Sequence, residues 1–293
     1  MKAGFVAILG RPNVGKSTLL NAMLSKKVSI VSPKAQTTRD AISGIYEEKG
    51  IQIVFVDTPG IHTGERKLDS HMRRSAFSSS RDVDAILYLL DASKKDLEED
   101  FRIVSSISSD APRIFVLNKI DLIRPEEGKE KIEAIQERFP ECPIIEASLK
   151  ENFGLKEIKE AVIPLLSSDM PFYPHDMITD KDMSYQAKEV IREKMLHFLR
   201  DEIPHSSAVK IDSIKEKQEG ILLRATLILD KENHKGIVIG KGGSMIKKLS
   251  FAARQELERM WKRHIASLEL QVDVIPGWRD SPKALQDIGY GDR

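Results

Sequence analysis

The first 167 residues alternate short apolar runs with stretches in which apolar residues recur at helical spacing. Short apolar runs bounded by turn residues are typical of buried strands, and the stretches between them are long enough for helices. Strands that alternate with helices favour a mostly parallel sheet covered by helices on both faces. The expected strands are residues 5–9, 52–56, 85–90, 113–117 and 143–145, and the expected helices are 16–24, 69–80, 97–108, 128–138 and 154–167.

The pattern changes after residue 183 and predicts a second, small α+β domain at 184–293. A helix is followed by two strands, a pair of helices around a glycine cluster, and a last strand. Residues 168–183 contain two prolines and no periodic pattern, so we predict a linker there, after a first domain at 1–167. The expected elements of the second domain are helix 184–202, strands 207–216 and 220–230, the helical pair 235–265 and strand 268–275.

The composition fits two globular domains and excludes several other classes of protein. The chain has 293 residues, 41 % hydrophobic and 31 % charged, with a net charge of +1, unlike histone-like or acidic disordered proteins. Cys142 is the single cysteine, which excludes an intrachain disulfide and a cysteine zinc site. No apolar run approaches the roughly 20 residues of a membrane span, and the N-terminus lacks a signal-peptide pattern. We therefore expect a cytoplasmic protein.

The segment Gly10-Arg-Pro-Asn-Val-Gly-Lys-Ser17 fits the P-loop pattern G-x-x-x-x-G-K-[ST], directly after an expected strand and before an expected helix. Its glycines let backbone N–H groups surround phosphates, and the N-terminus of the following helix favours anions. The Lys16 ammonium can reach the β- and γ-phosphates, and the Ser17 hydroxyl can bind Mg²⁺. The candidate phosphate-binding residues are Gly10, Arg11, Pro12, Asn13, Val14, Gly15, Lys16, Ser17 and Thr18.

Two further segments can complete the phosphate site. Asp57-Thr-Pro-Gly60 follows the expected strand 52–56, where a carboxylate faces the ligand crevice of a parallel sheet. Its aspartate can hold Mg²⁺, directly or through water, and the N–H of its last glycine can approach the γ-phosphate. Between the two motifs lies Gln36-Thr-Thr-Arg39, in which we choose Thr38 over Thr37 as a Mg²⁺ ligand that depends on the γ-phosphate. The candidate residues are Asp57, Thr58, Pro59 and Gly60 for the nucleotide, Ser17, Thr38 and Asp57 for Mg²⁺, and Lys16, Thr38 and Gly60 for catalysis.

A third pair of segments can read the base. Asn118-Lys-Ile-Asp121 follows the strand expected at 113–117. An aspartate carboxylate can accept hydrogen bonds from guanine N1–H and the N2 amino group, whereas adenine has no donor at either place. Asn118 can connect this segment to the P-loop, the Lys119 stem can lie along the base, and a backbone N–H of Ser148-Leu-Lys150 can meet guanine O6. The candidate base-binding residues are Asn118, Lys119, Asp121, Ser148, Leu149 and Lys150.

The second domain contains a different candidate site, the glycine cluster Gly240-Lys-Gly-Gly243. Residues 235–263 hold eight basic and two acidic residues, which suits a polyanion, although a solvated helix face would look the same. A G-x-x-G loop lets the backbone approach a nucleic-acid backbone, and this one resembles the loop of a KH domain, with an element order similar to type II. The candidate RNA-binding residues are Ile239, Gly240, Lys241, Gly242, Gly243, Lys247, Lys248 and Arg254.

The nucleotide motifs resemble those of the translation-factor-related GTPases. Within them, GRPNVGKS, QTTRD, DTPG and NKID are similar to the group of Era, MnmE and EngA. Ile61 follows DTPG where Ras-like proteins place a glutamine that orients water, and it can also be simple apolar packing. Asn13 stands at the position that resembles the potassium-coordinating asparagine of MnmE-like members, where a cation would stabilise charge, or it can cap the loop. Leu149 replaces the usual alanine of that group, at a backbone contact.

A P-loop GTPase domain followed by a type II KH domain resembles the architecture of the Era family over nearly the whole chain. The resemblance implies GTP and GDP binding, GTP hydrolysis with Mg²⁺, and binding of single-stranded 16S rRNA near its 3′ end in the 30S subunit. It also implies peripheral association with the inner membrane, and we expect a monomer. The alternative is a nucleotide-regulated RNA-binding module with negligible turnover, because Ile61 stands where the glutamine would be.

Overall fold

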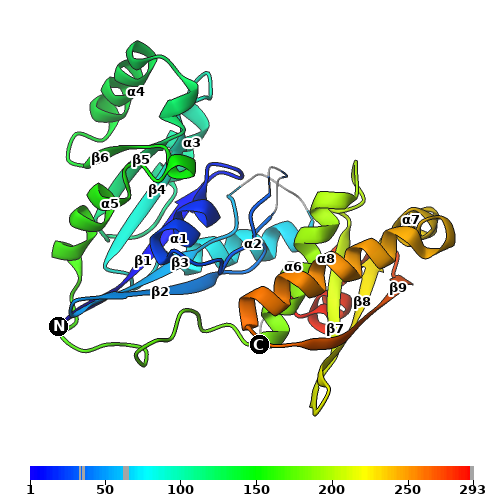
Figure 1. Cartoon of the computed structure of the whole chain (residues 1–293). Helices are drawn as coiled ribbons and strands as arrows, with labels where there is room; N and C mark the ends of the chain where they lie inside the picture. Colours follow the sequence, from blue (N-terminus) through cyan, green and yellow to red (C-terminus); the bar gives the residue numbers. More distant parts are fainter. Residues whose placement is uncertain (33, 35–36, 62–65, 291–293) are drawn as a thin grey trace. The chain divides into compact units, whose positions relative to one another are not determined.

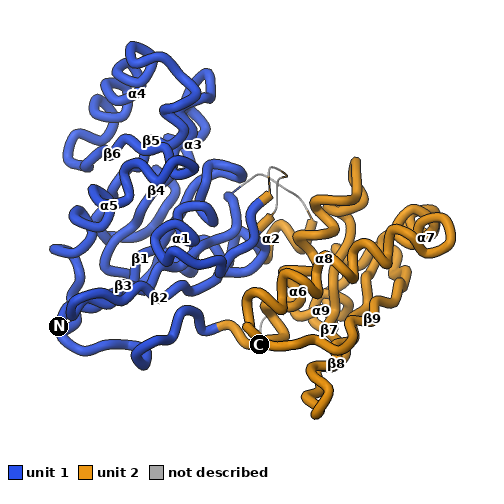
Figure 2. The backbone as a smooth tube through the Cα atoms, viewed as in Figure 1, with its two compact units in different colours: residues 1–31, 38–63, 72–180 blue, residues 32–37, 64–71, 181–293 orange. Residues whose placement is uncertain are grey.

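The computed structural model describes the chain except for residues 33, 35–36, 62–65 and 291–293 (Figure 1). The chain divides into two compact units (Figure 2). Unit 1 comprises residues 1–31, 38–63 and 72–180, and unit 2 comprises residues 32–37, 64–71 and 181–293. Two short segments from the first half of the chain therefore group with its C-terminal part.

Unit 1 is built on a six-stranded sheet in the order β2-β3-β1-β4-β5-β6, parallel except for the antiparallel pair β2 and β3. The central strand β4 is buried along its whole length, as expected of a strand covered on both faces. The edge strand β2 was not predicted from the hydrophobic pattern. The strands are β1 (Lys2–Gly10), β2 (Ile42–Glu48), β3 (Ile51–Asp57), β4 (Ala85–Asp91), β5 (Arg113–Asn118) and β6 (Ile144–Ala147).

The helices of unit 1 cover the sheet, which confirms the predicted α/β class. Phe101 of α3 and Ile135 of α4 pack with Tyr88 and Phe115 of the central strands in one apolar cluster. α1 contacts α5 as well as β1 and β3. The helices are α1 (Lys16–Leu24), α2 (Lys67–Ser78, of which the part after His71 belongs to unit 1), α3 (Glu98–Ser105), α4 (Pro125–Arg138) and α5 (Leu155–Val162).

Residues 168–180, most of the expected linker, belong to unit 1. Ser168 forms a β-bridge with Ala3, and Thr179 forms one with Gly44. The buried Gln52 side chain accepts hydrogen bonds from the backbone N–H groups of residues 172 and 173, at 2.8 and 3.0 Å. The division into units therefore falls after residue 180, close to the start of the next helix at Met183.

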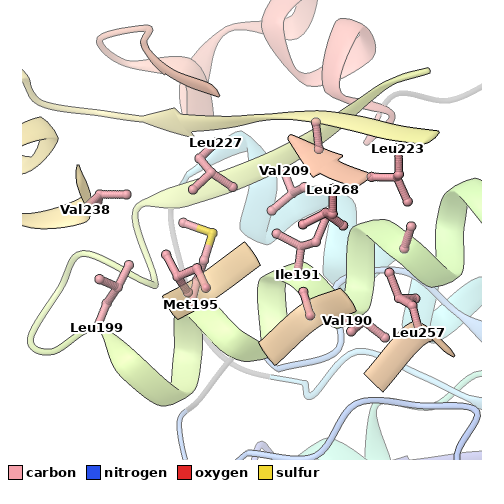
Figure 3. Packing of buried hydrophobic residues seen from close by; sticks show 14 of the residues in the cluster. Val190, Ile191, Met195, Leu199, Val209, Leu223, Leu227, Val238, Leu257 and Leu268 are labelled. Carbon is pink, nitrogen blue, oxygen red and sulfur yellow. The ribbon is translucent and has the colours of Figure 1, made fainter. Parts of the chain in front are cut away.

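Unit 2 contains a three-stranded sheet in the order β7-β8-β9, with β7 and β8 antiparallel and β8 and β9 parallel. Apolar residues of α6 and α8, including Ile191, Met195 and Leu257, pack with Val209, Leu223 and other sheet residues (Figure 3). This is the small α+β domain that the element order predicts. Its elements are α6 (Met183–Phe198), β7 (Ser207–Lys217), β8 (Gly220–Leu229), α7 (Glu232–Ile239), α8 (Ser244–Trp261) and β9 (Ile265–Val274).

A C-terminal helix, α9 (Pro282–Ile288), was not predicted. The Ser281 hydroxyl caps its first turn by accepting from Ala284 N at 3.3 Å. The Trp278 indole N–H donates to Ser206 O at 2.9 Å, and the Lys188 ammonium lies 3.8 Å from the centre of the buried Tyr290 ring. The tail thus completes the core of unit 2. Among the described residues, no helix is both long and apolar enough to span a bilayer.

Candidate nucleotide-binding site and nucleic-acid interface

The P-loop connects the end of β1 to the start of α1, as predicted. Gly15 has a φ of +111°, and a Cβ there would lie 2.4 Å from Asn118 Nδ2, so only glycine fits. The Arg11 guanidinium turns to α3, at 2.5 Å from Glu99 and 3.5 Å from Asp100. Arg11 is therefore placed to contribute to a phosphate site through its backbone.

The Lys16 side chain lies across the loop. Its ammonium donates to Gly10 O at 3.0 Å and to Arg11 O at 2.8 Å. Burial lowers the pKa of Lys16 to about 8, against the opposing effect of the Asp57 and Asp100 carboxylates. A bound phosphate group would place a negative charge beside this buried ammonium and so stabilise its charged form.

Ser17, Thr38 and Asp57 come together although they are separated in the sequence. Asp57 Oδ2 accepts from Ser17 Oγ at 2.7 Å and from Thr38 Oγ1 at 3.4 Å, and the two hydroxyl oxygens are 3.0 Å apart. Asp57 Oδ1 is buried and has no hydrogen-bond partner among the described residues. Burial raises the pKa of the Asp57 carboxyl, so a nearby cation would favour its ionised form. Two hydroxyls and a carboxylate with a free buried oxygen fit Mg²⁺.

Thr37 does not join this cluster. Its hydroxyl donates to Lys34 O at 2.6 Å, whereas Thr38 is 5 % exposed and faces Asp57. Gln36, the residue before this pair in the predicted motif, lies outside the described residues. The structure thus brings together the threonine that we chose and the other two candidate Mg²⁺ ligands.

The DTPG segment lies directly against the P-loop. A Cβ on Gly60 would lie 2.8 Å from Pro12, so only a residue without a side chain permits this approach. The Thr58 hydroxyl donates to Ile8 O at 2.8 Å and so fastens the segment to β1. Ile61 is 5 % exposed, and its N–H donates to Gly10 O at 3.3 Å. Its burial agrees with the packing alternative for this residue.

Asn13 has a φ of +64° in the P-loop. Asparagine tolerates this left-handed conformation better than most residues, so the path of the loop by itself accounts for an asparagine here. Its role toward K⁺ stays a prediction.

The base-reading segments are joined by Asn118. Its Nδ2 donates to Val14 O at 2.8 Å, and its Oδ1 accepts from Leu149 N at 3.0 Å. The Ser148 hydroxyl donates to Asp121 Oδ1 at 2.6 Å. Ser148 N donates to Phe153 O at 3.3 Å, so the backbone N–H groups of Ser148 and Leu149 both have partners within the protein.

Several polar residues outside the motifs hold these segments in place. The Asp91 carboxylate accepts from Lys119 Nζ at 2.6 Å and from Ser93 Oγ at 2.6 Å. The Ser29 hydroxyl donates to Asp57 Oδ2 at 2.8 Å. Sequence reasoning missed both Asp91 and Ser29. Asp91 had one usable signal, an acidic residue at the carboxyl end of a buried parallel strand.

In unit 2, the GKGG loop connects α7 to α8. Gly240 has a φ of +75°, and a Cβ there would lie 2.7 Å from Met245 N, whereas a Cβ on Gly242 (φ +60°) would meet nothing within 4 Å. The first glycine is required by packing, and Gly242 leaves space for an incoming backbone. The charged candidates Lys241, Lys247 and Lys248 are exposed, and Ile239 and Arg254 are half-buried.

Two family models and several known proteins match the chain. Residues 5–119 match the model of the 50S ribosome-binding GTPase family, and residues 202–279 match the KH domain model. The chain is 40 % identical to GTPase Era of Geobacter metallireducens over 99 % of this chain and 98 % of that one. It is 44 % identical to GTPase Era of Caldanaerobacter subterraneus subsp. tengcongensis, with the same coverage.

Two solved structures are similar over the full length. One is a point variant of Aquifex aeolicus Era bound to GDP·AlF₄⁻, with a TM-score of 0.95 and 38 % identity over 100 % of both chains. The other is Era in complex with MgGDPNP and nucleotides 1506–1542 of 16S ribosomal RNA, with a TM-score of 0.94 and 39 % identity over 100 % of both chains. These likenesses cover unit 1 and unit 2 together.

Proposed function

Because the chain belongs to the Era family of GTPases, we propose that it couples GTP hydrolysis to the binding of 16S rRNA near its 3′ end during assembly of the 30S subunit. The observation that carries the GTPase part is the meeting of Ser17, Thr38 and Asp57 within 3.4 Å beside the P-loop. The RNA part is supported by the KH domain match and by the similar Era structure that contains 16S rRNA.

The residues of the phosphate site have different roles in hydrolysis. Lys16 neutralises the β- and γ-phosphates, and the backbone of residues 10–15 surrounds them. Ser17, Thr38 and Asp57 would hold Mg²⁺, which when bound withdraws charge from the phosphate oxygens. The Gly60 N–H approaches the γ-phosphate from the DTPG side. Ile61 is apolar and buried, so orientation of the attacking water is assigned to other groups.

Guanine is selected by Asp121, with Asn118 joining the base-reading segments to the P-loop. The Asp121 carboxylate accepts from the N1–H and the N2 amino group of guanine. Adenine has no donor at either place and would leave the carboxylate without these partners. The Lys119 ammonium is held by Asp91 at 2.6 Å, which keeps the aliphatic stem available to lie along the base. These contacts give the site a preference for GTP and GDP.

The RNA site is assigned to the GKGG loop and the basic start of α8. Lys241, Lys247 and Lys248 supply charge toward phosphates, and Gly242 lets the backbones approach. The family also leads us to propose a monomer in the cytoplasm that associates peripherally with the inner membrane. Sedimentation of the protein alone tests whether it is a monomer, and sedimentation with inner-membrane vesicles tests whether it associates with the membrane.

The test of the main proposal is multiple-turnover GTP hydrolysis, measured by phosphate release with and without a 16S rRNA 3′-end oligonucleotide and in K⁺ or Na⁺. We expect turnover that depends on Mg²⁺, and tight binding of the oligonucleotide. Bound GTP with no phosphate release under any of these conditions would favour the alternative of a nucleotide-regulated RNA-binding module, which rests on Ile61.

A further inference from the structure

The Asp57 carboxylate is held by three hydroxyl groups, and one of them belongs to no motif. Ser17 Oγ, Ser29 Oγ and Thr38 Oγ1 lie 2.7, 2.8 and 3.4 Å from Asp57 Oδ2. Ser17 and Thr38 are themselves proposed Mg²⁺ ligands, so neither supports the carboxylate independently of the ion. Ser29, only 1 % exposed, is the remaining hydroxyl.

Ser29 is fixed to α1 by the side chain of Asn21. Asn21 Oδ1 accepts from Val28 N at 2.8 Å and from Ser29 N at 2.9 Å, and Asn21 Nδ2 donates to Ser29 O at 2.7 Å. One amide thus pairs with both backbone groups of Ser29. Ser17 and Asn21 are both residues of α1, so this helix carries the Ser17 hydroxyl directly and holds Ser29 through the Asn21 amide.

We propose that Ser29, anchored by Asn21, is a positioning residue that orients the Asp57 carboxylate for Mg²⁺, an inference that rests on the metal site of the proposed function. Donation from Ser29 fixes Oδ2 on the protein side. The buried Oδ1, which has no hydrogen-bond partner among the described residues, is then the oxygen available to the ion or to its bound water. Hydrogen-bond partners of metal ligands set ligand orientation and strengthen metal binding.

A purely structural role for Ser29 makes a different prediction. A hydroxyl that only satisfies a buried carboxylate would stabilise the fold equally with and without metal, and its removal would change stability alone. A positioning role changes the Mg²⁺ requirement specifically, because the orientation of Asp57 matters only when the ion binds.

The experiment measures the release of a fluorescent GDP analogue from the full chain across a series of Mg²⁺ concentrations and in EDTA. For Ser29→Ala, we expect the Mg²⁺ concentration that half-maximally slows release to rise about 10–100-fold, with release in EDTA as in the wild type. Ser80→Ala is the matched control, because Ser80 is 2 % exposed in the same unit and its hydroxyl donates to Phe77 O at 2.8 Å. It should keep the wild-type Mg²⁺ requirement.

An unchanged Mg²⁺ requirement for folded Ser29→Ala, or faster release by an equal factor with and without Mg²⁺, would overturn the positioning role. If Ser29→Ala does not fold, Asn21→Asp carries the test. It replaces the amide donor toward Ser29 O by an acceptor, and it must raise the Mg²⁺ requirement in the same direction. If the wild type released the GDP analogue at the same rate at every Mg²⁺ concentration, the metal site of the proposed function would be refuted instead.

Discussion

The P-loop shows that membership of a binding motif does not fix what a side chain does. Arg11 and Lys16 are the two basic residues of the loop. The Arg11 guanidinium, however, pairs with Glu99 and Asp100 of α3. Asn118, which lies about one hundred residues later, donates directly to the loop at Val14 O. The loop is therefore shaped by groups from β5 and α3 as much as by its own sequence.

Asp121→Asn should exchange the preference for guanine for a preference for xanthine. The new amide donates where xanthine O2 accepts, and it no longer matches the two guanine donors. Affinities for GTP and XTP, measured by competition with a fluorescent nucleotide, give the ratio. Asp110→Asn, an exposed aspartate outside the site, is the control and should keep the wild-type ratio. Asp121 does not read the base if the variant prefers GTP as strongly as the wild type does.

Hydrolysis should be faster in K⁺ than in Na⁺ at equal ionic strength, and the difference should vanish without the Asn13 amide. The reason is that Ile61 is apolar, so a cation beside the developing phosphate charge would contribute a few kcal/mol, roughly, to the transition state. Asn13→Gly is the better variant than Asn13→Ala, because glycine accepts the φ of +64° without strain. Phosphate release in the two salts measures the effect. Equal wild-type rates in both would exclude the potassium hypothesis.

The sequence predicts where the motif residues lie, but it does not predict which other residues hold them in place. Ser17, Thr38 and Asp57 each sit in a motif whose position relative to a strand or helix is readable, so their meeting was predictable. Ser29 and Asp57 are 28 residues apart, and their contact depends on how the chain between α1 and β2 folds back. No local pattern of polar residues encodes that path.

At the scale of elements, the central strands were found and the edge strand was missed. β4 and β5 are continuous apolar runs, as buried parallel strands should be. β2 reads Ile-Ser-Gly-Ile-Tyr-Glu-Glu, with a glycine inside and charges at its end, and only three of its seven residues are buried. Pairing with β3 stabilises it in spite of this sequence. In the same way, α9 is only seven residues long, too short to be stable alone, and buries Ala284, Leu285 and Ile288.

The GKGG loop should carry most of the RNA affinity. Replacing Lys241 and Gly242 together by Asp should abolish binding of single-stranded RNA and leave GTP affinity nearly unchanged. The new charges repel phosphates, and the added Cβ occupies space that the structure leaves open. Asp tolerates the φ of +60° at Gly242, so the variant should fold. Fluorescence anisotropy with a labelled oligonucleotide measures binding, and wild-type affinity in the folded variant would refute the KH site.

Lys247→Ala, one turn into α8, should weaken RNA binding without abolishing it. A single phosphate contact changes the slope of log affinity against log salt by roughly one unit or less. The control is Lys262→Ala at the end of the helix, which removes the same charge away from the GKGG loop. A change in slope for Lys247→Ala alone would indicate a phosphate contact rather than an effect of net charge. An unaltered slope for Lys247→Ala would place this lysine outside the RNA path.

At the scale of the whole molecule, residues 32–37 and 64–71 connect the two activities by chain continuity. Both segments group with unit 2. The first is followed directly by Thr38, and the second begins four residues after Gly60 of DTPG. Within unit 2, the Arg192 guanidinium donates to Thr37 O and pairs with Glu189 at 2.6 Å, and both charged side chains are buried. Thr37, the residue next to a proposed Mg²⁺ ligand, is thus held by α6 of unit 2.

If GTP and GDP set Thr38 differently and RNA affinity depends on that difference, nucleotide and RNA binding are coupled, and the coupling must be reciprocal. The factor by which GTP instead of GDP changes RNA affinity should equal the factor by which RNA changes the preference for GTP over GDP. Typical coupling corresponds to about 5–150-fold. Both factors can be measured with a non-hydrolysable GTP analogue, GDP and one oligonucleotide. Two unequal factors would show that the species compared are not at equilibrium or that hydrolysis intervened.

Replacing the Glu189–Arg192 pair by two glutamines should bring this factor close to one. Changing both residues avoids leaving one buried charge unpaired, which would cost about 3–5 kcal/mol of stability. The double variant should keep RNA affinity in the GDP state and GTP affinity without RNA, because neither residue is in a proposed binding site. The matched control replaces the exposed pair Arg263 and Glu216, 2.7 Å apart in the same unit, by glutamines. A wild-type coupling factor in the Glu189/Arg192 variant would show that the contact of Arg192 with Thr37 does not couple the nucleotide state to RNA binding.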